Sequence, residues 1–224
     1  CEDGIDIYTR NRVQQILGDH GLTTRITDTP IEAEANIFLG VKGSNGVAVQ
    51  KAAALGLNTD VLSKANKFDR HILSLTDGSG NAQLVIIGEN TDATFYGLAS
   101  LEQMLDQGTT GLLTVTINDY ADLKERGIIE GFYGKPYDNE VRKDLMRYMM
   151  RFKMNSYVYG PKCDPYHSST WADPYPTTIT STQDQQGFMT QAKMQDLTET
   201  AHASKVNVSW AIHPGNSLLN DGQV

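Results

Sequence analysis

Three short segments in the second half of the sequence combine glycines with aromatic, acidic, basic or imidazole side chains. They are GIIEGFYG at 127–134, YVYGPKCDPYH at 157–167 and WAIHPG at 210–215. Each contains or ends a run of β-forming residues, and side chains at the ends of strands are well placed to meet a ligand. These segments are the first candidates for binding or proton transfer.

The first segment offers an accessible backbone beside an aromatic ring. Gly131 and Gly134 let a ligand come close to the main chain, and Tyr133 can present its ring or its hydroxyl. A tight turn with packed aromatic side chains would use the same residues. Glu130, just before Gly131, fits a catalytic acid and also fits a hydrogen-bonded structural carboxylate.

The second segment places a lysine between two prolines just after a predicted strand. Pro161 and Pro165 restrict the backbone around Lys162, whose ammonium can donate to ligand hydroxyls. A solvated surface lysine is the ordinary alternative. Asp164 and His167 fit an acid–base pair, and they also fit hydrogen bonds that hold the loop to itself.

Metal and cofactor sites are disfavoured by the spacing of the candidate ligands. His213 in the third segment has no partner nearby, and the five histidines form no HxH or HExxH pattern. Cys1 and Cys163 make neither a CxxC pair nor a disulfide framework. No GxGxxG or P-loop is present, so we expect no nucleotide and no other cofactor.

Composition favours a soluble globular protein. The 224 residues include 19 Lys+Arg and 27 Asp+Glu, a formal charge of −8 that works against binding to nucleic acid or to an anionic membrane. No run approaches the ~20 apolar residues of a membrane span, and no apolar leader opens the chain. Cys1 in place of Met indicates that something preceded it. A processed bacterial lipoprotein and an arbitrary boundary both explain Cys1, so the compartment stays open, with an extracellular or cell-surface bacterial location favoured.

Residues 1–122 alternate short strands with helices, which predicts a compact α+β domain. The clearest helix begins near Thr91 or Asp92, shows apolar residues at helical spacing and ends at Gly108. The other expected elements are helices at 12–17 and 47–55 and strands at 23–27, 36–41, 71–76, 83–88 and 112–117. A polar connection is expected at 118–126.

Residues 123–224 show a regular strand, helix, strand, helix, strand order, which predicts parallel pairing with right-handed crossovers. The expected strands lie at 127–133, 155–159 and 206–212, and the expected helices begin at Asp138 or Asn139 and at about Gln183, ending near 153 and 203. The strand ends favour a (β/α)8 barrel over a doubly wound sheet. Since a whole barrel needs roughly 200 residues or more, we expect these three strands to be the front portion of a longer protein.

These motifs resemble those of one known protein family. The segment GIIEGFYGKPYDNEVRKDLMRYMMRFKMNSYVYGPKCDPYH, followed by WADPYP and WAIHPG, is similar to the opening of the catalytic barrel of glycoside hydrolase family 84. Its members are β-N-acetylglucosaminidases known as O-GlcNAcases, and some are described as hyaluronidases. Upstream, IGENTDATFYGLASLEQML resembles the helix of the α+β domain that precedes the barrel in families 84 and 20.

The resemblance implies a retaining reaction on an N-acetylglucosamine-containing glycan or glycoprotein. The acetamido oxygen of the substrate acts as nucleophile, and two adjacent aspartates at the end of the fourth barrel strand assist it. This chain contains no Asp-Asp dipeptide, so the catalytic pair is expected beyond it. The sugar-binding residues that carry over are Gly131, Lys162 and, lining the same pocket, Tyr133. The departures are Cys163, where the family commonly has Asp, and Tyr137, where it has Trp.

Two other hypotheses remain open at this point. One is a catalytically inactive carbohydrate-binding or scaffold protein with the same fold. The other is a different sugar-processing barrel that uses Glu130 and Asp164 as its carboxylate pair. Whether the natural substrate is a protein-linked sugar, a mucin glycan or a polysaccharide end depends on surfaces outside these motifs.

Overall fold

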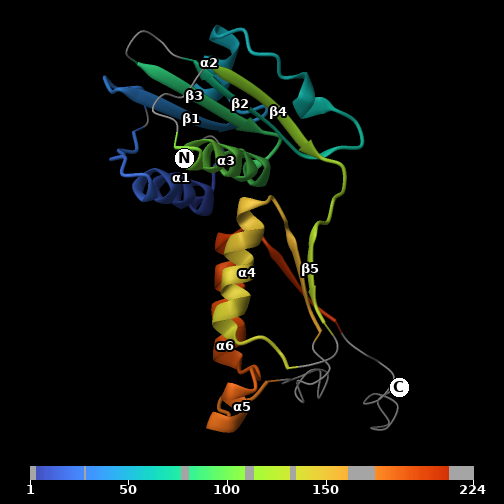
Figure 1. The fold of residues 1–224 in the computed structure, drawn as a ribbon. Coiled ribbons are helices and arrows are strands. Elements are labelled where there is room, and N and C mark those ends of the chain that lie inside the picture. The colour runs from blue at the N-terminus through green and yellow to red at the C-terminus, as the bar shows by residue number, and fades with distance from the viewer. Residues whose placement is uncertain are drawn as a thin grey trace. The chain divides into compact units, whose positions relative to one another are not determined.

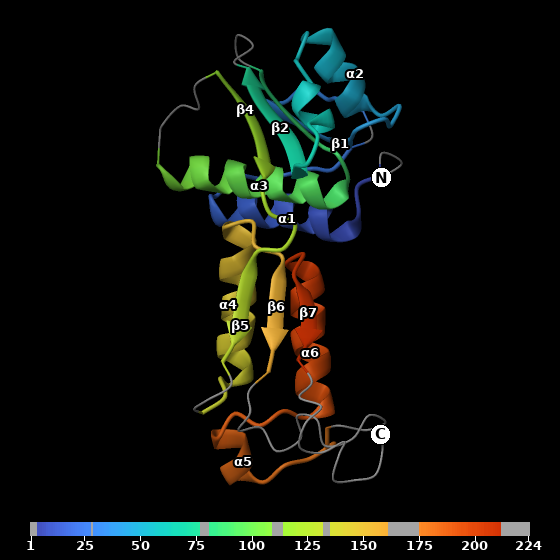
Figure 2. The same cartoon turned by 90° about the vertical axis from the view of Figure 1, so that its right-hand side faces the viewer.

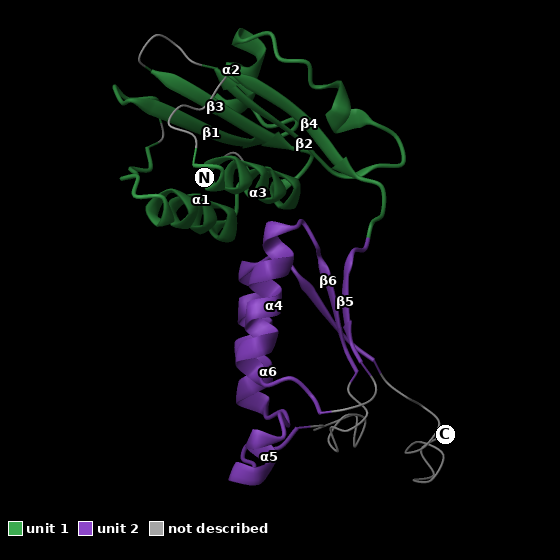
Figure 3. Cartoon of the chain, viewed as in Figure 1, with its two compact units in different colours: residues 1–124 green, residues 125–224 purple. Residues whose placement is uncertain are grey.

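The chain forms two compact units, residues 1–124 and 125–224, each with its own sheet and its own core (Figure 3). The structure, a computed structural model, describes residues 4–27, 29–76, 81–108, 114–131, 135–160 and 175–211. Within this described part, no helix is long and apolar enough to cross a membrane.

Unit 1 is built on a four-stranded mixed sheet. The strand order is β1-β3-β2-β4, in which β1 runs parallel to β3 while β2 is antiparallel to both β3 and β4. The strands are β1 (Ala35–Val41), β2 (Phe68–Thr76), β3 (Ala82–Gly88) and β4 (Val115–Ala121). The central position of β2 and β3 explains why both strands are buried along most of their length, and why β3 contains the continuous apolar run Leu84–Ile87.

Helices cover both faces of this sheet (Figure 1). On one face lie α1 (Ile7–Asp19) and α3 (Thr91–Asp106), and on the other lie α2 (Val47–Ala54) and the short 3-10 helix η1 (Asp60–Ser63). The alternation within β2 fits this arrangement, since Leu73 packs with α1 and α3 while Ile72 packs with α2 and η1. A buried ion pair between Arg12 and Glu102 joins α1 to α3.

Unit 2 contains a three-stranded parallel sheet in the order β5-β6-β7. Its strands are β5 (Gly127–Glu130), β6 (Ser156–Tyr159) and β7 (Asn207–Trp210), and its helices are α4 (Asn139–Arg151), α5 (Ser181–Gln185) and α6 (Gln191–Ala203). Both α4 and α6 lie on the same side of the sheet (Figure 2). This is the parallel, strand–helix–strand arrangement that the sequence predicts.

The core of unit 2 lies between the sheet and those two helices. Tyr157 and Tyr159 of β6 are fully buried there, against Met146 and Met149 of α4 and Leu197 of α6. The intervening strand residues point the other way, and Ile129 of β5 is 62% exposed. The sheet therefore has one packed face and one open face.

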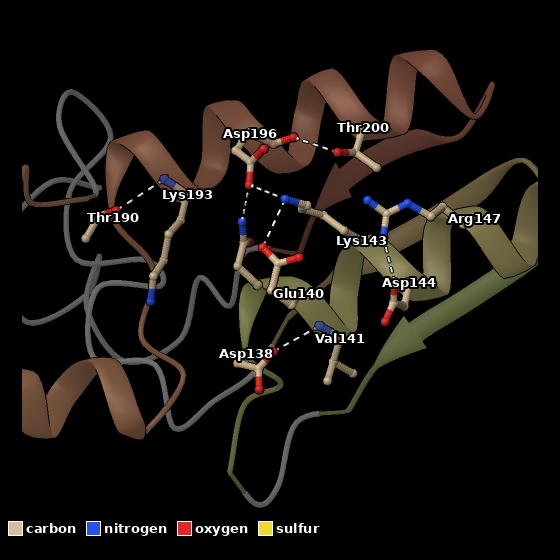
Figure 4. Close-up of polar contacts among 11 residues, drawn as sticks. Asp138, Glu140, Val141, Lys143, Asp144, Arg147, Thr190, Lys193, Asp196 and Thr200 are labelled. Carbon is tan, nitrogen blue, oxygen red and sulfur yellow. Dashed lines mark hydrogen bonds and ion pairs between the residues drawn. The ribbon is translucent and has the colours of Figure 1, made fainter. Parts of the chain in front are cut away.

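Polar contacts align α4 with α6. Asp138 caps α4 by accepting from the backbone N–H of Val141 at 2.9 Å, as the sequence predicts. Asp196 of α6 accepts from Asn139 at 2.9 Å and from Lys143 at 3.0 Å (Figure 4). These bonds fix the rotation of α4 about its axis. The side chain of Arg142, one turn after Asn139, then lies on the buried side of the helix.

The expected helices of unit 1 and its expected strands at 36–41, 71–76 and 83–88 are confirmed. The strand expected at 112–117 overlaps β4 from Val115 onward, and residues 112 and 113 lie outside the described residues. Three other expectations are corrected. Residues 23–27 form no strand, because this exposed segment pairs with no neighbour and buries nothing. The cap of α3 is Asn90, whose Oδ1 accepts from Ala93 N–H, rather than Thr91 or Asp92. Part of the expected polar connection 118–126 belongs to β4, since 118–121 pair with β2.

In unit 2 the single helix expected at about 183–203 is divided in two. Gly187 adopts a left-handed backbone with φ of +76°, which ends the helical path after α5. Thr190 then caps a new helix, α6, by accepting from Lys193 N–H at 3.2 Å. Met189, between the two helices, is buried in the same core as Leu197 and Ala201 of α6.

Gly127 should be intolerant of a side chain, and this tests the pairing of β5 with β6. A Cβ at this position would lie 1.5 Å from the carbonyl oxygen of Ser156. We expect Gly127→Ala to lower the free energy of unfolding of unit 2 by about 2–3 kcal/mol. Both tryptophans of the chain, Trp171 and Trp210, lie in unit 2, so tryptophan fluorescence in a urea titration reports this unit.

The control is Gly18→Ala in α1, where no atom lies within 4 Å of the added Cβ. This change should be neutral or raise the stability of unit 1 by up to ~1 kcal/mol, because alanine favours helix. It is followed by far-UV circular dichroism, since both tryptophans lie in unit 2. Equal stability losses in the two variants would contradict the described pairing of β5 with β6.

Candidate functional site

The candidate site lies at the carboxyl ends of the three parallel strands. The register aligns Glu130, Tyr159 and Trp210 in one row across β5, β6 and β7. The next residues along the chain are Gly131, Gly160 and Ala211, all small. Carboxyl ends of parallel strands are the usual place for a binding site in sheets of this kind.

Glu130 is the carboxylate of this row, and it is only 3% exposed. Its Oε2 accepts from Arg142 Nε at 2.9 Å and from the Tyr157 hydroxyl at 2.6 Å, and its Oε1 accepts from Arg142 Nη2 at 2.9 Å. The backbone N–H of Tyr137 also donates to Oε1, at 3.0 Å. The carboxylate is thus bonded on both oxygens, by a guanidinium, a phenol and a backbone amide.

Arg142 supplies the charge that this buried carboxylate needs. Its side chain is completely buried, and it lies over the ring of Tyr159 with 4.9 Å between the guanidinium carbon and the ring centre. Although burial alone would lower it, the pKa of Arg142 is raised because the Glu130 carboxylate bonds and attracts the guanidinium. A bidentate pair of this kind is the strong form of a charge-assisted hydrogen bond.

These contacts give Glu130 a structural role. It faces the helices together with Tyr157 and Tyr159, whereas a ligand on the open face would meet the alternate residues. The interpretation of Glu130 as a hydrogen-bonded structural carboxylate is therefore the one that the geometry supports. The hypothesis that pairs Glu130 with Asp164 as catalytic carboxylates has no geometric support, and Asp164 lies outside the described residues.

Gly131 is described and exposed. Within the described part of the chain, no atom lies within 4 Å of the position that a Cβ would take there, and its φ is not in the left-handed region. Neither packing nor backbone conformation in this part of the chain accounts for a glycine at 131. Tyr133 and Lys162 lie outside the described residues, as do Cys163, His167 and His213, so their roles stay predictions.

Two residues of this cluster, Arg142 and Tyr157, are absent from the sequence prediction. Arg142 shares one face of α4 with Met146 and Met149, at spacings of four and seven residues. A charged side chain within an apolar stripe predicts a buried partner of opposite charge, and that signal could have linked Arg142 to Glu130. Within the described ranges no group of three or more potential metal ligands is found.

Comparisons with known proteins are consistent with this fold and these motifs. The family model for β-N-acetylglucosaminidase matches residues 126–223. The protein O-GlcNAcases of Rattus norvegicus and Mus musculus are each 34% identical to this chain over 89 residues. That match covers 40% of this chain and only 8% of each relative's length.

Solved structures extend the likeness to the whole chain. The structure of CpGH84D is 34% identical with a TM-score of 0.79, over 96% of this chain and 33% of that one. CpGH84B is 25% identical with a TM-score of 0.64, over 96% of this chain and 34% of that one. A GH138 enzyme targeting pectin rhamnogalacturonan II shares the fold alone, at 16% identity and a TM-score of 0.57, over 91% of this chain and 28% of that one.

The predicted resemblance is confirmed. The chain resembles the N-terminal portion of a glycoside hydrolase of family 84, of the O-GlcNAcase kind. It spans about a third of the length of the solved relatives CpGH84D and CpGH84B.

The Tyr157 hydroxyl gives the cluster a measurable pH dependence. Burial, followed by the hydrogen bond to Glu130 and the negative charge of that carboxylate, raises the pKa of Tyr157 well above its ordinary value of 10. The stability that protonated Tyr157 contributes is therefore fully present below pH 10 and is lost as the pH rises towards the higher pKa of the folded state. We expect Tyr157→Phe to cost about 1.5–3 kcal/mol at pH 8, because a hydrogen bond to a charged group is lost.

Above pH 10 this difference between wild type and Tyr157→Phe should narrow by roughly 1.4 kcal/mol per pH unit. The measurement is urea unfolding followed by tryptophan fluorescence from pH 8 to pH 11.5. A difference that stays constant across this range would show that Tyr157 is not buried against Glu130. Taking the difference between the two proteins removes the titration of the other tyrosines and lysines.

Proposed function

We propose that this chain is the N-terminal part of a retaining β-N-acetylglucosaminidase that removes terminal N-acetylglucosamine from a glycan or glycoprotein. The observation that carries the proposal is the 34% identity to CpGH84D over 96% of this chain, together with the β-N-acetylglucosaminidase family match over 126–223. The described geometry supports it through the row of small residues Gly131, Gly160 and Ala211, which follow the ends of three parallel strands.

The proposed mechanism is substrate-assisted. The acetamido oxygen of the sugar attacks its own anomeric carbon as the glycosidic bond breaks, which gives an oxazoline and a protonated leaving group. One carboxyl group protonates the leaving oxygen and then activates water, while a second orients the acetamido group. We infer that both carboxyl groups come from residues beyond this chain, because the chain has no adjacent pair of aspartates.

The open face of unit 2 supports a larger closed sheet. Gly127, Ile129, Asn207 and Ser209 are exposed on this face, and the outer strands β5 and β7 each pair on one side only within the described residues. A sheet edge of this kind is normally paired or covered. We infer that further strand–helix units complete a (β/α)8 barrel, which would make the open face its interior.

Within that barrel we assign sugar contacts to Gly131, Lys162 and Tyr133. The backbone at Gly131 would lie against the sugar, because a glycine there is not required by packing among the described residues. Lys162 would donate to sugar hydroxyls from the end of β6, and Tyr133 would line the same pocket. The α+β character of unit 1 matches the domain that precedes the barrel in the resembling families.

The chain alone should be catalytically inactive, because it lacks the aspartate pair. We expect no release of 4-nitrophenol from 4-nitrophenyl N-acetyl-β-D-glucosaminide by the 224-residue chain, and release by a longer chain that includes the next strands. Turnover by the short chain at a rate comparable to that of the longer chain would overturn the placement of the catalytic carboxyl groups. Loss of all activity in the longer chain would overturn the proposed reaction.

Gly131→Ala tests the proposed sugar contact. The change should leave the stability of unit 2 within ~0.5 kcal/mol, since no atom of the described residues lies within 4 Å of the added methyl group. In the longer active chain it should raise KM for the chromogenic substrate by at least ~10-fold, because the methyl group occupies the position of the sugar. The matched glycine control is Gly18→Ala in α1, which is distant from Gly131 in the sequence and should leave KM unchanged. An unchanged KM in Gly131→Ala would exclude this contact.

A further inference from the structure

We propose that Glu130 is a positioning residue, which fixes the backbone on both sides of the segment that begins with Gly131. The proposal rests on the assignment of Gly131 to the sugar site. Glu130 is the last residue of β5, and its own carboxylate accepts from the backbone N–H of Tyr137 at 3.0 Å. The Glu130 side chain therefore ties the end of β5, immediately before Gly131, to the backbone of Tyr137, seven positions after Glu130.

Arg142 connects this arrangement to the rest of unit 2. Its guanidinium binds Glu130 twice, at 2.9 Å, and its Nη2 also lies 3.5 Å from the carbonyl oxygen of Gly187. Its Nη1 lies 3.6 Å from the sulfur of Met189. The carboxylate is thus tied, through one buried guanidinium, to helix α4 and to the connection between α5 and α6.

Gly187 packs against the backbone of residues 136 and 137. A Cβ at 187 would lie 2.5 Å from the carbonyl oxygen of Pro136 and 2.8 Å from that of Tyr137. The glycine lets the α5–α6 connection pack directly against residues 136 and 137. Both the charge of Glu130 and the absence of a side chain at 187 therefore act on the backbone of residues 136 and 137, which follow the segment that begins with Gly131.

Because both oxygens of the Glu130 carboxylate are already bonded, its role is to position the backbone and not to transfer a proton. Three protein groups occupy both oxygens of Glu130, and the side chain is buried on the helix face. A carboxylate held in this way has no free oxygen for a substrate proton, yet it determines where the main chain leaves the strand. We therefore assign Glu130 an effect on sugar binding that is transmitted through the backbone.

The test is a double variant, Glu130→Leu with Arg142→Met, in the 224-residue chain. Apolar replacement of a buried ion pair commonly preserves folding, whereas removal of one partner alone leaves an unpaired charge. The variant can pack its core and cannot hold the N–H of Tyr137. The matched control is Arg12→Met with Glu102→Leu, which replaces the buried ion pair of unit 1 in the same way.

Two NMR readouts are taken. The first is hydrogen exchange of the Tyr137 amide, which should accelerate at least ~10-fold in the double variant and not in the control. The second is the shift of the residue-131 amide signal during titration with N-acetylglucosamine, with glucose as the comparison sugar. Binding should weaken at least ~10-fold in the folded double variant and remain within about twofold of wild type in the control.

The outcomes separate this inference from the proposed function. If wild type shows no N-acetylglucosamine response at Gly131, the proposed sugar contact fails, and with it the inference. If wild type responds and the folded double variant binds within about twofold of wild type, the contact stands and the positioning role of Glu130 is wrong.

If the double variant does not fold, Gly187→Ala decides the question. It leaves the Glu130–Arg142 pair intact and pushes on the carbonyl oxygens of Pro136 and Tyr137. It should move the amide signal of Gly131 and weaken N-acetylglucosamine binding several-fold. Gly21→Ala is its control, since that glycine is also left-handed but has open space around it. Binding unchanged in Gly187→Ala would overturn the proposal.

Discussion

The arrangement of unit 2 depends on the buried ion pair between Glu130 and Arg142. Removing two charges from water is costly, and such a pair persists only when the remaining hydrogen-bonding capacity is also satisfied. Here Tyr157 and the backbone of Tyr137 complete the carboxylate, while the ring of Tyr159 lies against the guanidinium. A strand end, a neighbouring strand and a helix are thereby fixed by one set of bonds. These bonds therefore also fix the strand ends that the small residues follow.

The two faces of the parallel sheet have different roles. The packed face contains the aromatic and charged side chains that end β5 and β6, and these stabilise unit 2. The residues just beyond the strands, Gly131, Gly160 and Ala211, are small, which suits the approach of a sugar to the main chain in the proposed site. The polar and aromatic residues at the strand ends predicted a binding site at this end of the sheet. Among the described side chains, Glu130, Tyr157 and Tyr159 support the proposed site rather than line it.

Much of the fold could be predicted because periodicity, caps and glycine breaks act locally. The helix after Asp138 and the parallel strand order are examples. The strand expected at 23–27 was wrong because β propensity does not reveal whether a pairing partner exists. The apolar stripe of α4 indicates that Arg142 has a buried partner, but the contact with Glu130 forms only after α4 folds back on the sheet. Gly131 was a candidate from its own glycine–aromatic segment, and the resemblance assigned it a sugar contact, which stays a prediction.

The most direct test of this account is a crystal structure of the chain grown with N-acetylglucosamine. The account predicts a Glu130 carboxylate buried on the helix side, bonded to Arg142 and to the N–H of Tyr137, with the sugar against the backbone of Gly131 on the opposite side of the sheet. A Glu130 side chain turned to the open face and bonded to the sugar itself would contradict it. In that case the carboxylate would belong to the binding site, and its proposed role as a support would be wrong.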